Sequence, residues 1–239
     1  MRESRHWGDF PELFQNAMEG QHVVALDFPG NGSLHAQTSA SSIEGMVNSA
    51  RSQLQQLGFV PPYRLLAISL GAMVAVAWSD LYPDELEKMV LINTSLAPCN
   101  PFYHRLRPKN YPALTLLLFG SAIQRENLIL KLTSTRSRRE NLGPVLAQWI
   151  AYAEKYPITN ANILRQLKAA LGYRAAQTTP TVKTLLLASL QDQLVNAKCS
   201  LKLSQQWSCT FKLHPTAGHD FPLDDYVWVI SQVKRWLKS

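Results

Sequence analysis

The segment that most constrains the fold of this chain is residues 63–71, which read Tyr-Arg-Leu-Leu-Ala-Ile-Ser-Leu-Gly. An apolar strand pattern ends at Ser69, and residues 72–81 continue as an apolar helix. A chain that turns from a strand into a helix within one or two residues strains the backbone at the turn and brings the two elements nearly into contact. The residues two positions before and after Ser69 must therefore be small, and Ala67 and Gly71 meet this requirement.

The same turn points the amino end of the helix at Ser69. Unpaired N–H groups at a helix amino end favour developing negative charge. The backbone N–H of Leu70 is therefore a candidate oxyanion donor. An ordinary strand-turn-helix unit with an incidental serine has the same local composition, but it does not predict the acid and the histidine that follow later in the chain.

Strand and helix patterns alternate along most of the chain, which predicts an α/β fold with a mostly parallel central sheet covered by helices on both faces. Expected strands are residues 22–27, 63–68, 88–93, 182–188 and 209–213. Expected helices outside the middle of the chain are residues 10–17, 43–57, 72–81 and 226–237. From residue 98 to residue 179 the pattern predicts helices without strands, the clearest being 142–156 and 161–171. The chain therefore divides into a core of residues 1–97 and 180–239 and an inserted helical segment of residues 98–179.

Composition excludes several classes of protein. The apolar stretches are too short to span a bilayer, and no charged-then-apolar signal peptide begins the chain. Three cysteines without metal-type spacing predict reduced thiols and a cytoplasmic location. The histidines form no metal-ligand spacing, so neither a metal nor a cofactor is expected. Basic and aromatic residues are not interleaved, which argues against a nucleic-acid partner.

Two later motifs complete a pattern that Ser69 begins. Asp192 follows the apolar run of residues 185–188, and Gly218-His219 lies near the end of the chain. The order serine, acid, histidine resembles that of the α/β-hydrolase superfamily, in its small esterase-like branch with a helical cap. Residues 24–33 resemble the strand and Pro-Gly-x-Gly loop of that family, and His6-Trp7 resembles the opening of its first helix. The commoner nucleophile elbow has glycine at the position of Ala67.

The resemblance implies a serine hydrolase that cleaves a carboxylic ester or thioester through an acyl-enzyme. Ser69 would be the nucleophile, His219 would move its proton, and Asp192 would hold the imidazole. Asp220 and Asp224 are expected to be solvated or helix-capping residues. A catalytically silent binding or regulatory protein of the same fold is the alternative, although such a protein need not keep all three residues.

The formal net charge of +7 belongs to the predicted cap. Residues 100–178 hold 12 lysines and arginines against 3 glutamates, a balance of +9, whereas the rest of the chain carries −2. A basic surface that faces inward would attract an anionic substrate, such as a carboxylate-bearing ester or an acyl thioester on a phosphorylated carrier. A solvated basic face is the alternative, and the run Arg136, Ser137, Arg138 and Arg139 is typical of an exposed loop.

The resemblance also implies a strand between the strands of residues 22–27 and 63–68. In the family that strand ends in His-Gly, supplies a second oxyanion N–H, and precedes the helix near His6-Trp7. Residues 1–5 leave no room for it. The expectation is therefore a gap in the sheet, unless the sheet closes up or another segment fills the place. We further expect a truncated chain in which Met1 is an internal methionine, with reduced activity.

Overall fold

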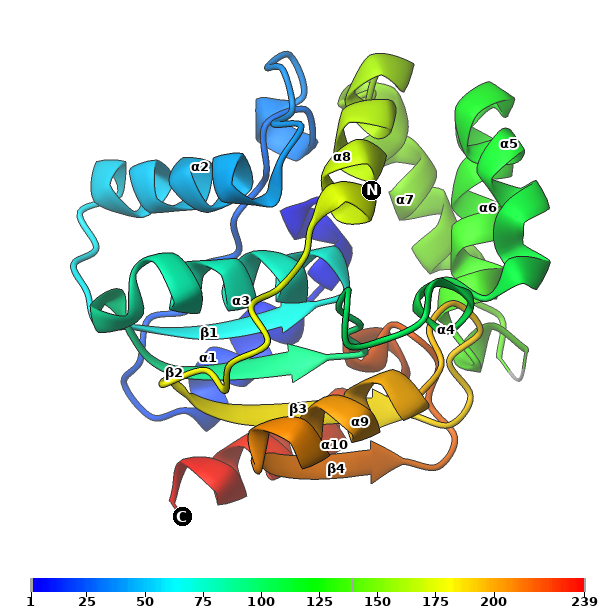
Figure 1. The fold of residues 1–239 in the computed structure, drawn as a ribbon. Helices are drawn as coiled ribbons and strands as arrows, with labels where there is room; N and C mark the ends of the chain where they lie inside the picture. Colours follow the sequence, from blue (N-terminus) through cyan, green and yellow to red (C-terminus); the bar gives the residue numbers. More distant parts are fainter. Residues whose placement is uncertain (1, 139, 239) are drawn as a thin grey trace.

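The computed structural model describes residues 2–138 and 140–238. Within these residues, the sheet has four parallel strands in the order β1-β2-β3-β4. They are β1 (Tyr63–Ile68), β2 (Leu86–Ile92), β3 (Lys183–Ser189) and β4 (Thr210–His214). Parallel neighbours need crossover connections, and helices supply them (Figure 1). The predicted α/β class with a parallel sheet between helices is confirmed.

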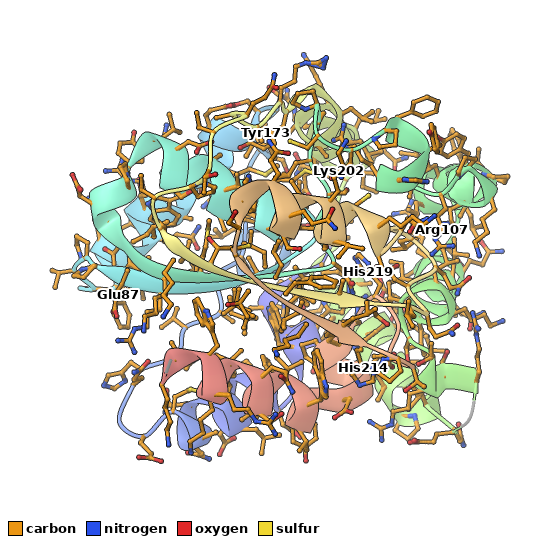
Figure 2. The ribbon with its side chains drawn as sticks, turned by 60° about the horizontal axis from the view of Figure 1, so that its bottom comes forward. Glu87, Arg107, Tyr173, Lys202, His214 and His219 are labelled. Atoms are coloured by element: carbon orange, nitrogen blue, oxygen red, sulfur yellow. The ribbon has the colours of Figure 1, made fainter. Side chains whose placement is uncertain are left out.

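Helices cover both faces of the sheet. The long helices outside the middle of the chain are α1 (Phe10–Ala17), α2 (Ile43–Gln56), α3 (Leu70–Leu81), α9 (Lys198–Trp207) and α10 (Phe221–Leu237). The short 3-10 helices are η1 (Ser4–Trp7), η2 (Gly32–Leu34), η3 (Pro83–Glu85), η4 (Pro108–Asn110) and η5 (Arg136–Arg138). Figure 2 shows α10 and α1 on the opposite side of the sheet from α3 and α9.

Two apolar cores result, one on each face of the sheet. Leu186 of β3 packs into the core formed with α2, α3 and α9, whereas Leu185 and Leu187 pack into the core formed with α1 and α10. All three leucines are fully buried. Because successive side chains of a strand point to opposite faces, a strand buried on both sides reads as a continuous apolar run.

The chain between β2 and β3 is helical. It forms α4 (Phe102–Arg105), α5 (Tyr111–Phe119), α6 (Ala122–Thr133), α7 (Gly143–Lys155) and α8 (Asn160–Gly172), with no strand among its described residues. In Figure 1, α5 and α6 lie beyond the arrowheads of the strands. A separate apolar cluster of Leu130, Leu142 and Trp149 holds α6 against α7. Within the described residues, no helix combines the length and the apolar character that crossing a membrane requires.

The strand expected at residues 22–27 is wrong. This segment has no regular structure and joins no strand of the sheet, and Val24 is 40% exposed. The physical reason is that an apolar pattern cannot form a strand without a neighbour to accept its hydrogen bonds. Among the described residues, β1 pairs with β2 alone, so its other edge is open. The related expectation about Met1 concerns a residue outside those that the structure describes.

Helix α10 begins earlier than residues 226–237, where the pattern placed it. The helix spans Phe221–Leu237, but Asp225 has φ −158° and ψ 74° and interrupts it. The Asp225 carboxylate accepts the N–H of Trp228 at 2.9 Å, which caps the second, longer section. The predicted start at Tyr226 therefore coincides with this interruption.

Candidate active site

Ser69 is the only residue between β1 and α3. Its φ of 53° and ψ of −110° lie in a region that residues other than glycine rarely occupy. The Ser69 N–H donates to the carbonyl of Ile92 at 3.1 Å, which fixes the turn to β2. A β-carbon added to Gly71 would lie 3.7 Å from that of Ala67, an ordinary van der Waals distance, so the strand and the helix lie close together here but leave room for a methyl group. The small residues at these two positions suit the turn.

Leu70 is the first residue of α3. Its N–H is therefore one of the amino-terminal donors for which an α-helix provides no partner. The N-terminus of a helix also carries partial positive charge. This donor and the Ser69 side chain belong to the same turn, as the sequence predicts.

Asp192 and His219 form a buried pair. His219 Nδ1 lies 2.7 Å from Asp192 Oδ2. Asp192 is 1% exposed and His219 is 6% exposed. The other carboxylate oxygen, Oδ1, accepts the N–H groups of Leu194 at 2.7 Å and Val195 at 3.0 Å. Asp192 therefore keeps a fixed orientation, and the imidazole donates through Nδ1 and leaves Nε2 as the acceptor.

Two effects act on the pKa of His219. Burial lowers it, because the charged imidazolium loses its hydration. The negative charge and the hydrogen bond of Asp192 raise it. The raising effects prevail, so the pKa of His219 lies above its ordinary value. Asp192 thus stabilises the protonated imidazole in a buried place.

Asn93 binds the backbone of residues 215–219, here called the histidine loop. The Asn93 side-chain amide donates to the carbonyl of His219 at 2.8 Å and to that of Gly218 at 3.3 Å. Its Oδ1 accepts the N–H of Ser189 at 3.0 Å. Asn93 follows β2 and Ser189 ends β3, so one amide ties two strand ends to the histidine loop. These contacts of Asn93 could not be found from local sequence pattern.

His214 holds the other end of the histidine loop. Its Nδ1 accepts the N–H groups of Ala217 at 2.8 Å and Thr216 at 3.1 Å, so the ring proton is on Nε2. Nε2 donates to Asp225 Oδ2 at 3.1 Å. His214 is the last residue of β4. Figure 2 shows His214 and His219 at the same end of the sheet.

The fold gathers all three residues of the predicted triad at the carboxyl-terminal end of the parallel sheet. Ser69, Asp192 and His219 follow the carboxyl ends of β1, β3 and β4, which are parallel. His219 and Asp192 are hydrogen-bonded to each other. Among the described contacts, none joins the Ser69 hydroxyl to His219 Nε2. Catalytic hydrogen bonds are often longer without substrate and tighten when it binds.

Comparison with known proteins identifies the family. The sequence pattern of the family described as "alpha/beta hydrolase fold" matches residues 4–226. The chain belongs to the α/β-hydrolase fold family. No curated protein sequence gave a significant match.

Solved structures show the same fold. A serine hydrolase from Cycloclasticus zankles superposes with a TM-score of 0.79 at 16% identity, over 99% of this chain and 85% of that one. A lipase described as putative, from Acinetobacter baumannii, has a TM-score of 0.76 at 20% identity, over 96% and 79%. A thermophilic esterase from Thermogutta terrifontis has a TM-score of 0.75 at 17% identity, over 99% and 86%. At these identities the likeness shows a shared α/β-hydrolase fold.

Three other aspartates of this α/β-hydrolase-fold protein, Asp220, Asp224 and Asp27, have different hydrogen-bond partners. The Asp220 side chain accepts the N–H of Leu223 and caps α10, as expected. The expectation that Asp224 is solvated or caps a helix is wrong. Its carboxylate accepts hydrogen bonds from Gly218 and from residues 134–136. The reason is that the end of α6 lies against the histidine loop, which local sequence could not indicate. Asp27 accepts bonds from Ser4 and Ser33 and orders a turn.

A cavity of about 320 Å³ lies between the amino-terminal segment and helices α6 and α7. Arg2, Glu3 and His6 line it from one side, and Glu126 and Tyr152 line it from the other. Burial and, next, the charge of Arg2 lower the pKa of His6 to about 4, so this imidazole is neutral at pH 7. None of the three predicted triad residues lines this cavity.

The basic residues of segment 98–179 mostly face solvent. Seven of them are exposed among those described: Lys109, Lys131, Arg138, Lys155, Arg165, Lys168 and Arg174. Among the described lysines and arginines of this segment, Arg125 lines the cavity of about 320 Å³. Arg139, part of the expected exposed run, lies outside the described residues. This distribution favours the solvated-face interpretation of the charge.

Proposed function

We propose that this protein is a serine hydrolase that cleaves carboxylic esters or thioesters of small molecules through a Ser-His-Asp triad. The observation that carries the proposal is the buried His219–Asp192 hydrogen bond at the same sheet edge as the strained Ser69 turn. An acid that holds an imidazole by Nδ1 leaves Nε2 ready to accept a proton. The structural neighbours named above, an esterase, a lipase described as putative and a serine hydrolase, agree with this proposal.

The chemistry proceeds in two halves. His219 Nε2 takes the proton of the Ser69 hydroxyl, whose oxygen bonds to the acyl carbon of the substrate. The oxygen of the former carbonyl becomes an oxyanion, which the N–H of Leu70 stabilises. The tetrahedral intermediate collapses, the C–O or C–S bond breaks, and His219 returns the proton to the leaving group. Water then attacks the acyl-enzyme with His219 as base, and the carboxylic acid leaves.

Asp192 serves both halves without taking the proton itself. Its negative charge stabilises the imidazolium that forms when Ser69 loses its proton. Two backbone N–H groups hold its other oxygen, so the carboxylate cannot rotate away. The negative charge of Asp192 and its hydrogen bond also raise the pKa of His219. His219 therefore acts as the base, because its Nε2 takes no part in the hydrogen bond to Asp192 and can accept a proton.

We further propose that residues 98–179 are a cap over this site, on a core formed by residues 1–97 and 180–239. Helices α5 and α6 lie beyond the carboxyl ends of the strands, where the three residues gather (Figure 1). Helix α6 ends at the histidine loop, which joins this segment to the proposed site. A cap in this position would select the acyl group or the leaving group of the substrate by its shape.

A catalytically silent binding protein is the second candidate. It is favoured by the missing bond between Ser69 and His219 and by the open edge of β1, which leaves Leu70 as the one oxyanion donor assigned among the described residues. Removing one oxyanion donor costs about 100- to 1000-fold in turnover. The two candidates differ in whether Ser69 is nucleophilic.

A fluorophosphonate probe distinguishes them, because it labels only a serine that a neighbouring base activates. We expect stoichiometric labelling at Ser69, identified by peptide mass spectrometry. A panel of chromogenic esters and acyl thioesters of graded chain length then defines the substrate class. Failure of the folded protein to label, together with no turnover across the panel, would establish the silent candidate.

A further inference from the structure

The carboxylate of Asp224 joins two segments that are far apart in sequence. Its Oδ2 accepts the N–H of Gly218, the residue before His219, at 2.6 Å. The same oxygen accepts the N–H of Thr135 at 2.9 Å, and the Thr135 hydroxyl lies 3.0 Å from it while donating to the carbonyl of Thr216 at 2.8 Å. Its Oδ1 accepts the Ser134 hydroxyl at 2.5 Å. One side chain therefore holds both the histidine loop and the chain that leaves α6.

The two segments touch closely at this point. The N–H of Asp220 donates to the carbonyl of Thr133, the last residue of α6, at 2.9 Å. A β-carbon added to Gly218 would lie 2.5 Å from the Thr133 carbonyl oxygen and 3.1 Å from Asp224 Oδ2. No side chain fits in that space. Gly218 is thus a glycine because Asp224 and the end of α6 approach the histidine loop from the same side.

We propose that Asp224 is a positioning residue that sets the place of His219 and couples it to the helices of segment 98–179. Its catalytic consequence rests on the proposed function. Because α6 packs on α7 through Leu130 and Trp149, a displacement of this helix pair reaches Thr135 and, through the Asp224 carboxylate, the N–H of Gly218. The imidazole one residue further moves with that N–H. The segment that covers the proposed site therefore adjusts the base beneath it.

A carboxylate is needed at this position. Its two oxygens are both acceptors, and the backbone N–H groups of residues 135, 136 and 218 and the Ser134 hydroxyl all donate to them. An asparagine keeps one acceptor oxygen and turns an NH₂ group toward donors on the other side. Either the histidine loop or the end of α6 is then released. A displacement of about 1 Å in a catalytic group can cost up to about 100-fold in rate.

The first variant is Asp224→Asn in the full chain. We expect kcat for a chromogenic ester to fall about 10- to 100-fold with KM changed little, because the base is displaced while the substrate pocket remains. The strongly deshielded NMR signal of the His219 Nδ1 proton, which reports the bond to Asp192, should shift or broaden. Asp220→Asn is the matched control, because it removes a charge four residues away and asparagine caps helices equally well. That control should keep the NMR signal and should keep kcat at pH values above the pKa of His219, a pKa to which the charge of Asp220 contributes.

The second variant approaches from the cap side and leaves Asp224 intact. Ser134→Ala combined with Thr135→Val removes both hydroxyl donors at the end of α6. We expect this pair to lower kcat and to disturb the same NMR signal. Combined with Asp224→Asn, its effect should be less than additive, since both changes break the connection through Asp224, and the remainder reports the direct bond from the Thr135 hydroxyl to the carbonyl of Thr216.

The outcomes separate the possible roles. A merely structural Asp224 would lower the melting temperature while kcat and the NMR signal stay as in the wild type, and this would overturn the proposal. An unchanged kcat in the Ser134 and Thr135 variant would also overturn the coupling. If the wild-type protein fails to label with a fluorophosphonate, the proposed function fails, and the NMR signal alone still decides whether Asp224 positions His219.

Discussion

His219 Nδ1 lies 2.7 Å from Asp192 Oδ2, and the same carboxylate receives two backbone N–H groups on its other oxygen. The acid is therefore fully engaged on both oxygens, and its orientation is fixed before any substrate arrives. An imidazole bound in this way has one tautomer, with Nε2 unprotonated. This relationship determines what each of the following changes should do.

Ser69→Ala should abolish turnover and probe labelling. Loss of a triad nucleophile costs on the order of a million-fold in turnover. The fold should be retained, because the Ser69 side chain makes no hydrogen bond with the other described residues and its backbone contacts do not depend on it. Ester turnover, probe labelling and circular dichroism of the purified variant check this. Wild-type turnover in the variant would show that Ser69 is not the nucleophile.

Asp192→Asn should lower kcat about 10,000-fold, since the amide favours the wrong tautomer of His219. It should also lower stability, because an asparagine cannot accept both from His219 and from the N–H groups of Leu194 and Val195 without turning its NH₂ toward one of them. Steady-state kinetics and denaturant unfolding measure the two effects. Equal loss of activity in Asp220→Asn would assign the acid role elsewhere.

Activity should rise with pH through the pKa of His219, which the structure raises above its ordinary value. The stabilising effect has the opposite sign. A raised pKa in the folded state contributes stability that is present below the unfolded pKa and is lost as pH rises through the folded pKa. In Asp192→Asn the raising charge is gone, so the acidic limb of the rate profile should move to lower pH. An unmoved limb would mean that another group controls it.

Because His6 is buried, we expect the free energy of unfolding to fall in acid. Burial and the charge of Arg2 lower its pKa to about 4, so between the unfolded pKa and that value only the unfolded chain takes up the proton. From pH 7 to pH 5 this linkage costs about 2 kcal/mol. Urea unfolding at the two pH values measures it. His6→Asn should have a correspondingly smaller difference, and an equal difference would exclude His6 as the cause.

Anionic and neutral esters of equal size should be cleaved at similar rates. Most described basic residues of segment 98–179 face solvent, where salt screens their charge. Comparison of kcat/KM for a carboxylate-bearing ester and its neutral isostere at low and high salt tests this. A preference for the anion that shrinks as salt rises would instead indicate that the basic residues act on the substrate.

The local elements of the core were predictable from sequence, because their periodicity and end signals are local. The strand before Ser69 and the helix after it follow from an apolar run, a small-residue turn and a second apolar run. The strand expected at residues 22–27 failed because periodicity describes side chains and is silent about the partner that a strand requires.

The triad candidates could be named in advance, but the residues that hold them could not. Asn93 contacts the histidine loop from 125 positions away in the chain, and Asp224 joins that loop to Thr135, which lies 89 positions before it. Such contacts depend on how the strand ends and α6 meet in space. No spacing in the sequence encodes them.

The open edge of β1 gives the sheet an uneven resistance to local opening. The side chains of β1 are half-buried or exposed, whereas those of β3 are almost all buried. Backbone amides of β3 should therefore exchange with deuterium far more slowly than those of β1, which has a neighbour on one side only among the described residues. Ser69 stands at the end of an edge strand of the described sheet, and His219 follows β4, the edge strand on the other side, whereas Asp192 follows the well-buried β3. On warming, the edge strands should open before β3, so Ser69 should lose its register with Asp192 before the domain melts and inactivation should precede unfolding.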